Sequence, residues 1–128
     1  MKCKELMVGD LVTGLHRLPM KITNVDDDYA YAHTYEDIWN GCEFDDEDNP
    51  PVPIPLTPEI LEKNGWKQNR EFFMEKEVNE NTHLSWTDRY GAALYKNTYH
   101  ICDCNYVHTL QHALRLCGLD ELADNFKL

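Results

Sequence analysis

Residues 105–119, NYVHTLQHALRLCGL, constrain the fold most because they carry the clearest periodic pattern in the chain. At the helical period, their apolar side chains form one stripe and their polar side chains fall on the other side. Asn105 is a favourable N-cap residue, and Gly118 suits the left-handed position that follows a helix. We therefore predict a helix that covers a core with a stripe of Val107, Leu110, Leu114 and Cys117, widened by Tyr106 and Ala113.

Length and cysteine content indicate one cytoplasmic domain. A chain of 128 residues buries about two thirds of the surface that its unfolded form exposes. The five cysteines are odd in number and unevenly spaced, and residues 1–10 contain no uninterrupted apolar run. We therefore expect neither disulfides nor a signal peptide, and no segment is apolar over the length that a membrane span needs. The predicted domain covers residues 1–128, with a β-rich lobe at 1–56 and a second lobe at 57–128.

The formal net charge is −11, from 23 acidic and 12 basic residues. This balance argues against direct nucleic-acid binding, which depends on clustered lysines and arginines that neutralise phosphates. The simplest interpretation is a solvated acidic surface. Attraction of a basic protein partner and mimicry of a nucleic acid are the alternatives.

The first lobe carries short β signals. Residues 5–14 place a tight Gly9-Asp10 turn between apolar pieces, and residues 19–33 give two strands around an acidic turn at 26–28. Residues 38–44 are a candidate third strand. Short, strongly bent strands are typical of a small SH3-like barrel, so we predict such a barrel or a bent sheet.

The composition of the chain changes at residue 45. The acidic run at 45–48 leads to four prolines, at positions 50, 51, 53 and 55. Prolines lack ladder donors, so this segment fits an extended connector. The acidic run lacks the ligand spacing and central glycine of an EF-hand, and we interpret it as a solvated loop. A short helix then begins with Thr57 as the cap and Pro58 at its first position, and ends at Gly65.

The second lobe reads as a β meander. Residues 70–78, 83–89, 92–96 and 99–104 form four strand-like segments separated by short turns. The helix at 105–119 is predicted to cover this sheet, which gives an α+β fold. Alternate strand residues would face the helix. The core candidates on that face are Phe73, Leu84, Trp86, Leu94, Tyr99 and Ile101.

Three segments, KELMVGDLV, PIPLTPEILEKNGW and YVHTLQHALRLCGL, resemble a group of small uncharacterised proteins of Bacteroides-group gut bacteria and their phages and mobile elements. The resemblance implies a compact α+β domain in a phage or mobile-element setting, and it carries over no catalytic residue. Similar proteins have a glutamate where this chain has Thr109. Without that general base between His108 and His112, the zinc-protease motif is incomplete, and a metalloprotease interpretation fails.

Histidines and cysteines near residue 100 form a first candidate cluster. Residues 100, 102 and 104 would share one face of a strand, and the following helix would bring a histidine near its end. Zinc prefers such ligands, but the spacing matches no common zinc module. Buried cysteines also behave as small apolar residues. We therefore predict no metal and no cofactor, and name only weak candidate ligands: His100, Cys102, Cys104 and His108.

The polar side of the predicted helix is a second candidate site. Its side chains offer donors suited to phosphate or carboxylate, and an aromatic residue such as Trp39 or Trp66 would stack on a base. A solvated helix face explains the same residues. The candidate ligand-binding residues are His108, Gln111, His112 and Arg115.

Nucleophilic catalysis has weaker support. Cys104 with His108 or His100 would form a thiolate pair, yet no glycine elbow or oxyanion-hole signature accompanies it. We therefore predict that the chain is not an enzyme. The leading hypothesis is a non-enzymatic binding module of phage or mobile-element origin that acts through protein contacts in the cytoplasm. The alternatives are a protein that sequesters a small nucleotide signal and a zinc-dependent enzyme.

Overall fold

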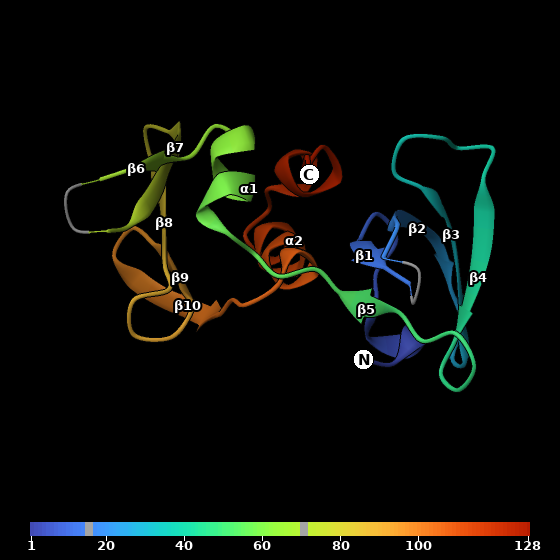
Figure 1. Ribbon diagram of the computed structural model, residues 1–128. Coiled ribbons are helices and arrows are strands. Elements are labelled where there is room, and N and C mark those ends of the chain that lie inside the picture. Colours follow the sequence, from blue (N-terminus) through green and yellow to red (C-terminus); the bar gives the residue numbers. More distant parts are fainter. Residues whose placement is uncertain (15–16, 70–71) are drawn as a thin grey trace. The chain divides into compact units, whose positions relative to one another are not determined.

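The computed structural model describes residues 1–14, 17–69 and 72–128 (Figure 1). Its contacts divide the chain into two compact units, each with a five-stranded antiparallel sheet. Unit 1 comprises Met1–Ile54 and Tyr106–Asp124, and unit 2 comprises Pro55–Asn105 and Asn125–Leu128. The predicted α+β fold class is confirmed. Within the described ranges, no helix has both the length and the apolar content required to cross a bilayer.

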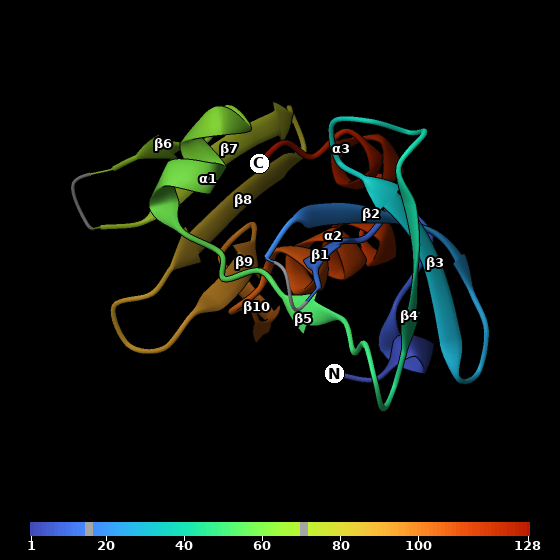
Figure 2. The same cartoon turned by 45° about the vertical axis from the view of Figure 1, so that its right-hand side comes forward.

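Unit 1 contains a curled half-barrel, as the bent N-terminal strands predicted. Figure 2 shows its strands curving around a concave side. The strand order is β4-β3-β2-β1-β5. A short 3₁₀ turn, Cys3–Glu5, precedes the strands β1 (Leu11–Thr13), β2 (Pro19–Val25), β3 (Tyr29–Thr34), β4 (Gly41–Asp45) and β5 (Val52–Pro53).

Side-chain alternation explains which face of the half-barrel is buried. In β3 the tyrosines Tyr29 and Tyr31 are exposed, while Ala30 and Ala32 between them are buried. Small alanines on the inner face leave room for the ring of Phe44, which is fully buried. The core cluster of this unit consists of Cys3, Leu6, Val12, Met20, Ile22, Ala30, Ala32 and Phe44.

Helices α2 (Val107–Leu116) and α3 (Asp120–Asp124) also belong to unit 1. The predicted C-terminal end of α2 is confirmed, because Gly118 has φ +76°. The predicted N-cap is wrong: Tyr106 occupies that position and its side chain makes no capping hydrogen bond. This helix does not belong to the predicted lobe at 57–128, because its contacts group it with the N-terminal strands, where it contacts β1.

Unit 2 contains the predicted meander, in the order β10-β9-β8-β7-β6. The caps of its helix are confirmed: the Ile60 N–H donates to Thr57 Oγ1 at 3.2 Å, and Gly65 has φ +85°. Arg70, where the first strand was predicted to begin, lies outside the described residues. The elements are α1 (Pro58–Lys63), β6 (Lys67–Gln68), β7 (Met74–Asn79), β8 (Thr82–Thr87), β9 (Ala93–Lys96) and β10 (Tyr99–Asp103).

Half of the predicted core of the meander is correct. Leu84, Trp86 and Leu94 are buried, whereas Phe73 is half-buried and Tyr99 and Ile101 are exposed. Two register features account for Phe73 and Ile101, whereas Tyr99 precedes the bulge, at the exposed start of β10. Met74 rather than Phe73 pairs with Trp86 and is buried, and a bulge in β10 shifts the alternation after His100.

Candidate functional site

The polar residues predicted to bind a ligand lie together on α2, but most of their hydrogen-bonding groups serve the chain itself. Gln111 is fully buried. Its Oε1 accepts from the Leu11 N–H at 2.9 Å, and its Nε2 donates to the Gly9 carbonyl at 2.9 Å and the Ala123 carbonyl at 3.0 Å. This amide therefore fixes the turn before β1 and the end of α3 onto α2.

The carboxylate of Asp10, which is fully buried, contacts two further candidates, Arg115 and His112. Arg115 Nη1 donates to its Oδ1 at 2.7 Å, and His112 Nε2 lies 2.6 Å from Oδ2. The Met7 N–H donates to Oδ2 at 2.8 Å. Since a buried carboxylate requires such partners, these contacts neutralise the donors that were expected to bind phosphate.

The close approach of Arg115 to the turn explains why residue 9 is a glycine. Gly9 has φ +93°, and a Cβ placed there would lie 2.8 Å from Arg115 Nη2. A larger residue would meet both a steric clash and an unfavourable backbone conformation. The sequence Gly9-Asp10 thus forms a structural clamp with α2, in addition to the turn that the sequence indicated.

The ring of His108, the remaining candidate on α2, contacts aromatic neighbours. It stacks on Tyr106, with ring centroids 5.9 Å apart, and meets His112 edge to face at 5.5 Å. Its Nδ1 is buried and has no hydrogen-bond partner within the described residues. Burial lowers the pKa of His108 below its usual value, which favours a neutral ring rather than an anion-binding one.

The histidine and cysteine candidates for zinc do not share a strand face. In β10, His100 pairs with Tyr95 while Cys102 pairs with the neighbouring Leu94, so the bulge places the two side chains on opposite faces of the sheet. The prediction that residues 100, 102 and 104 share a face is therefore wrong. In the part of the chain that the structure describes, no group of three His, Cys, Asp or Glu side chains is arranged to hold a metal ion.

Cys104 is also poorly suited to nucleophilic attack. Its side chain is buried, and its backbone carbonyl accepts a hydrogen bond from Trp86 Nε1 at 2.8 Å. Burial raises the pKa of the Cys104 thiol well above its usual value, and the neighbouring Cys102 raises it further. Since both attack and zinc ligation require the thiolate, Cys104 behaves as a small core residue.

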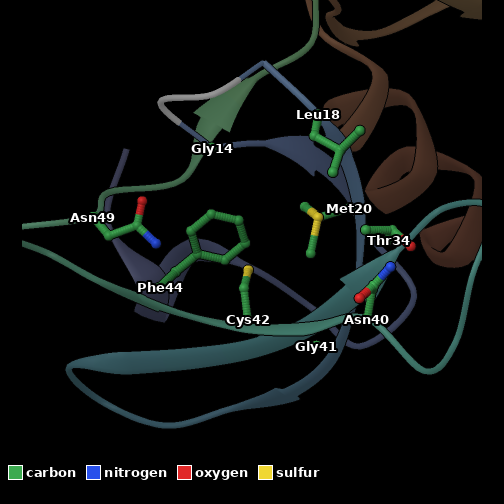
Figure 3. A pocket seen from close by; sticks show the side chains of 9 residues that line it. All are labelled: Gly14, Leu18, Met20, Thr34, Asn40, Gly41, Cys42, Phe44 and Asn49. Carbon is green, nitrogen blue, oxygen red and sulfur yellow. The ribbon is translucent and has the colours of Figure 1, made fainter.

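A pocket opens on the concave side of the half-barrel, with a volume of about 370 Å³. Figure 3 shows the side chains of Phe44, Cys42, Met20 and Leu18 converging on one space. Phe44 and Met20 are buried at its base, while Leu18 is 52% exposed. We call this the half-barrel pocket; it is lined by Gly14, Leu18, Met20, Thr34, Asn40, Gly41, Cys42, Phe44 and Asn49.

Gly14 permits the packing that forms the base of this pocket. A Cβ at residue 14 would lie 3.1 Å from Phe44 Cε1, closer than ordinary van der Waals contact. The absence of a side chain therefore lets the Phe44 ring reach the end of β1. Apolar side chains also continue beyond the pocket along the chain: Ile38 and Trp39, next to Asn40 in the β3–β4 loop, are 67% and 88% exposed.

Acidic residues concentrate in the same unit as this pocket. Unit 1 contains 15 acidic and 5 basic residues, whereas unit 2 contains 8 and 7. Asp45 ends β4, and three more acidic residues follow it in the loop that ends at Asn49. Asp45 organises this loop by accepting the backbone N–H groups of Glu47 and Asp48, which lower its pKa. The half-barrel pocket therefore lies in a strongly negative unit, suited to an apolar group flanked by positive charge.

Neither the contacts of Asp10 with α2 nor the half-barrel pocket is among the features predicted from the sequence. An acidic residue within the otherwise apolar run at 6–12 was the available signal for the clamp. The available signal for the pocket was that Cys42 and Phe44, two positions apart, lie on the same face of a strand. Only the curl of the sheet brings Leu18 and Gly14 near them. Comparisons of the chain with protein-family models, curated proteins and solved structures find no match.

Proposed function

We propose that this chain is a non-enzymatic protein-binding module of phage or mobile-element origin, which takes an apolar side chain of a basic partner segment into the half-barrel pocket. The observation that carries the proposal is an open apolar pocket in a unit with 15 acidic and 5 basic residues. The resemblance of three segments to phage and mobile-element proteins supports the setting, and action in the bacterial cytoplasm follows from the same proposal.

The energetics of such a contact favour an apolar anchor with a basic surround. Protein interfaces gain most of their affinity from a few side chains that fill well-packed pockets. Charges around the pocket contribute mainly to the rate of encounter and to the choice of partner. A partner with lysines or arginines next to a leucine, methionine or aromatic residue meets both requirements.

The chemistry of the other candidate sites gives less support to the alternatives. A nucleotide would bring phosphates to a unit whose arginine and histidine donors on α2 are bound to Asp10. A zinc enzyme would need thiolates from Cys102 and Cys104, yet Cys104 is buried with a raised pKa. Protein binding needs none of these groups.

Selection from a displayed library of random 12-residue peptides tests the proposal. We expect wild-type protein to enrich peptides with an apolar residue flanked by lysine or arginine, and the binding of a synthesised hit to weaken as salt rises. Leu18→Glu should weaken this binding at least about tenfold, equivalent to about 1.4 kcal/mol.

Leu116→Glu is the matched control, because Leu116 is also an exposed leucine of unit 1 (88%) but does not line the pocket. It should bind the peptide as wild type does. Failure to enrich any peptide, or equal binding by Leu18→Glu and Leu116→Glu, would overturn the proposal.

A further inference from the structure

Strand β4 forms an edge of the half-barrel next to the pocket. In the described part of the chain, β4 ends the strand order and pairs only with β3. Gly41 and Cys42 of this strand line the half-barrel pocket together with Phe44. An exposed strand edge offers backbone donors and acceptors to another extended chain.

The hydrogen bonds of neighbouring residues show which backbone groups point to that edge. The Glu43 carbonyl accepts from Asn49 Nδ2 at 2.8 Å, and the Asp45 N–H donates to the Asn49 carbonyl at 3.1 Å. On the other side, the Asn40 carbonyl accepts from the Thr34 N–H of β3 at 2.8 Å. Odd-numbered residues of β4 therefore direct their backbone groups away from β3.

This alternation leaves a short open stretch beside the pocket. Asn49 occupies the Glu43 carbonyl and the Asp45 N–H, so it covers the far part of the edge. The Gly41 N–H and carbonyl and the Glu43 N–H point to the edge where Asn49 does not reach. Side chains of the even residues, Cys42 and Phe44, face the pocket at the same place.

We infer that the partner segment binds as an extended strand paired with residues 41–43 of β4, which places one of its apolar side chains in the half-barrel pocket. The inference rests on the proposed function and specifies its binding mode, β-strand addition. Backbone pairing then supplies affinity that does not depend on sequence, while the pocket selects the apolar residue. Charge favours a basic segment, because Glu43 lies on the paired stretch and the acidic loop at 45–48 continues from β4.

The test compares Glu43→Pro with Glu43→Ala. Proline removes the N–H that points to the open edge without removing a bond to β3, and edge strands tolerate proline at such positions. Alanine removes the same carboxylate but keeps the N–H. With the peptide selected on the wild-type protein as the probe, Glu43→Pro should bind at least about tenfold more weakly than Glu43→Ala. Equal affinities would overturn strand addition.

Hydrogen exchange on the unmodified protein provides a second measurement that does not depend on the folding of the proline variant. Saturating peptide should slow exchange of the Gly41 and Glu43 amides, which face the open edge. Unchanged exchange at both amides, with the peptide bound, would also overturn the inference.

The outcomes separate the inference from the proposed function. Binding that is sensitive to Leu18→Glu but equal for Glu43→Pro and Glu43→Ala retains the pocket and rejects strand addition. If the library yields no binding peptide, the proposed function fails and the inference fails with it.

Discussion

The two units contain similar sheets but differ in their balance of acidic and basic residues. Both contain five antiparallel strands in sequential or nearly sequential order. Unit 2 balances 8 acidic with 7 basic residues, and its His83 lies between Glu75 and Glu77. Unit 1 has 15 acidic and only 5 basic residues, and Arg115 among these is committed to Asp10. The excess of negative charge is thus a property of unit 1, which is why we place the proposed basic partner on this unit.

A second difference concerns what holds each unit together. In unit 2 the buried row runs directly across paired strands, from Met74 to Trp86 and then to Leu94. In unit 1 a buried polar set, Asp10 with Gln111 on α2, joins residues about 100 positions apart in sequence. Unit 1 therefore adds a few specific long-range polar contacts to its strand pairing and apolar core.

The largest expected effect comes from breaking the buried ion pair. Asp10→Ala removes the fully buried carboxylate and leaves the half-buried Arg115 and His112 without it, which we expect to cost about 3–5 kcal/mol of unfolding free energy. Asp103→Ala in unit 2 is the control, because that carboxylate is 89% exposed, and its cost should stay within about 0.5 kcal/mol. Chemical denaturation measures both. Equal costs would contradict the role of the clamp.

A smaller loss is expected from Gln111→Leu. The leucine leaves the Leu11 N–H and the carbonyls of Gly9 and Ala123 without their partner, at a cost of about 2–3 kcal/mol. The exposed Gln68 of unit 2 provides the control Gln68→Leu, which should be nearly neutral. Hydrogen exchange should show the loss in unit 1 residues. A uniform loss over both units would mean that the units unfold as one.

The salt dependence of peptide binding should show which unit binds the peptide. Because the acidic excess lies in unit 1, raising the salt concentration should weaken binding of the selected basic peptide several-fold by screening. Glu47→Gln together with Asp48→Gln should weaken it by a smaller factor, since these side chains follow β4. The matched pair Glu75→Gln and Glu77→Gln in unit 2 should change it little. Calorimetric titration of each variant measures the difference, and equal effects of the two pairs would remove the electrostatic contrast.

The smallest effect concerns pH. Because the pKa of His108 is lower in the folded protein than in the unfolded chain, the unfolded chain takes up this proton first as the pH falls below about 6.5. Folding stability should therefore decrease on acidification through that range, with no contribution from His108 above it. His108→Gln should flatten this decrease, while His100→Gln, at an exposed position in unit 2, should retain it. Melting temperatures between pH 5 and 8 test this, and identical profiles for the two variants would contradict it.

Local signals in the sequence predicted local structure well. Thr57, Pro58 and Gly65 define α1 because capping depends on residues within one turn, and Gly118 ends α2 for the same reason. The meander followed from short turns between alternating segments. The bulge in β10 changed which residues are buried, since a single extra residue reverses the alternation that follows it.

Patterns in the sequence did not predict contacts between residues that are distant along the chain. The helical pattern showed an apolar stripe on residues 105–119 but not that the helix belongs with the N-terminal strands, which depends on Gln111 meeting Leu11. The same pattern placed Gln111 on a solvated face, although it is fully buried. Similarly, the half-barrel pocket exists because the sheet curls and brings Leu18 near Phe44, and curl is a property of the whole sheet.

Chemical-shift mapping of the selected basic peptide on ¹⁵N-labelled protein tests the central claim most directly. The account predicts that the largest shifts fall on Leu18, Met20, Gly41 and Phe44 at the half-barrel pocket, while the amides of unit 2, including Tyr95 and His100, remain unchanged. Largest shifts on unit 2 residues, with the half-barrel unaffected, would contradict it.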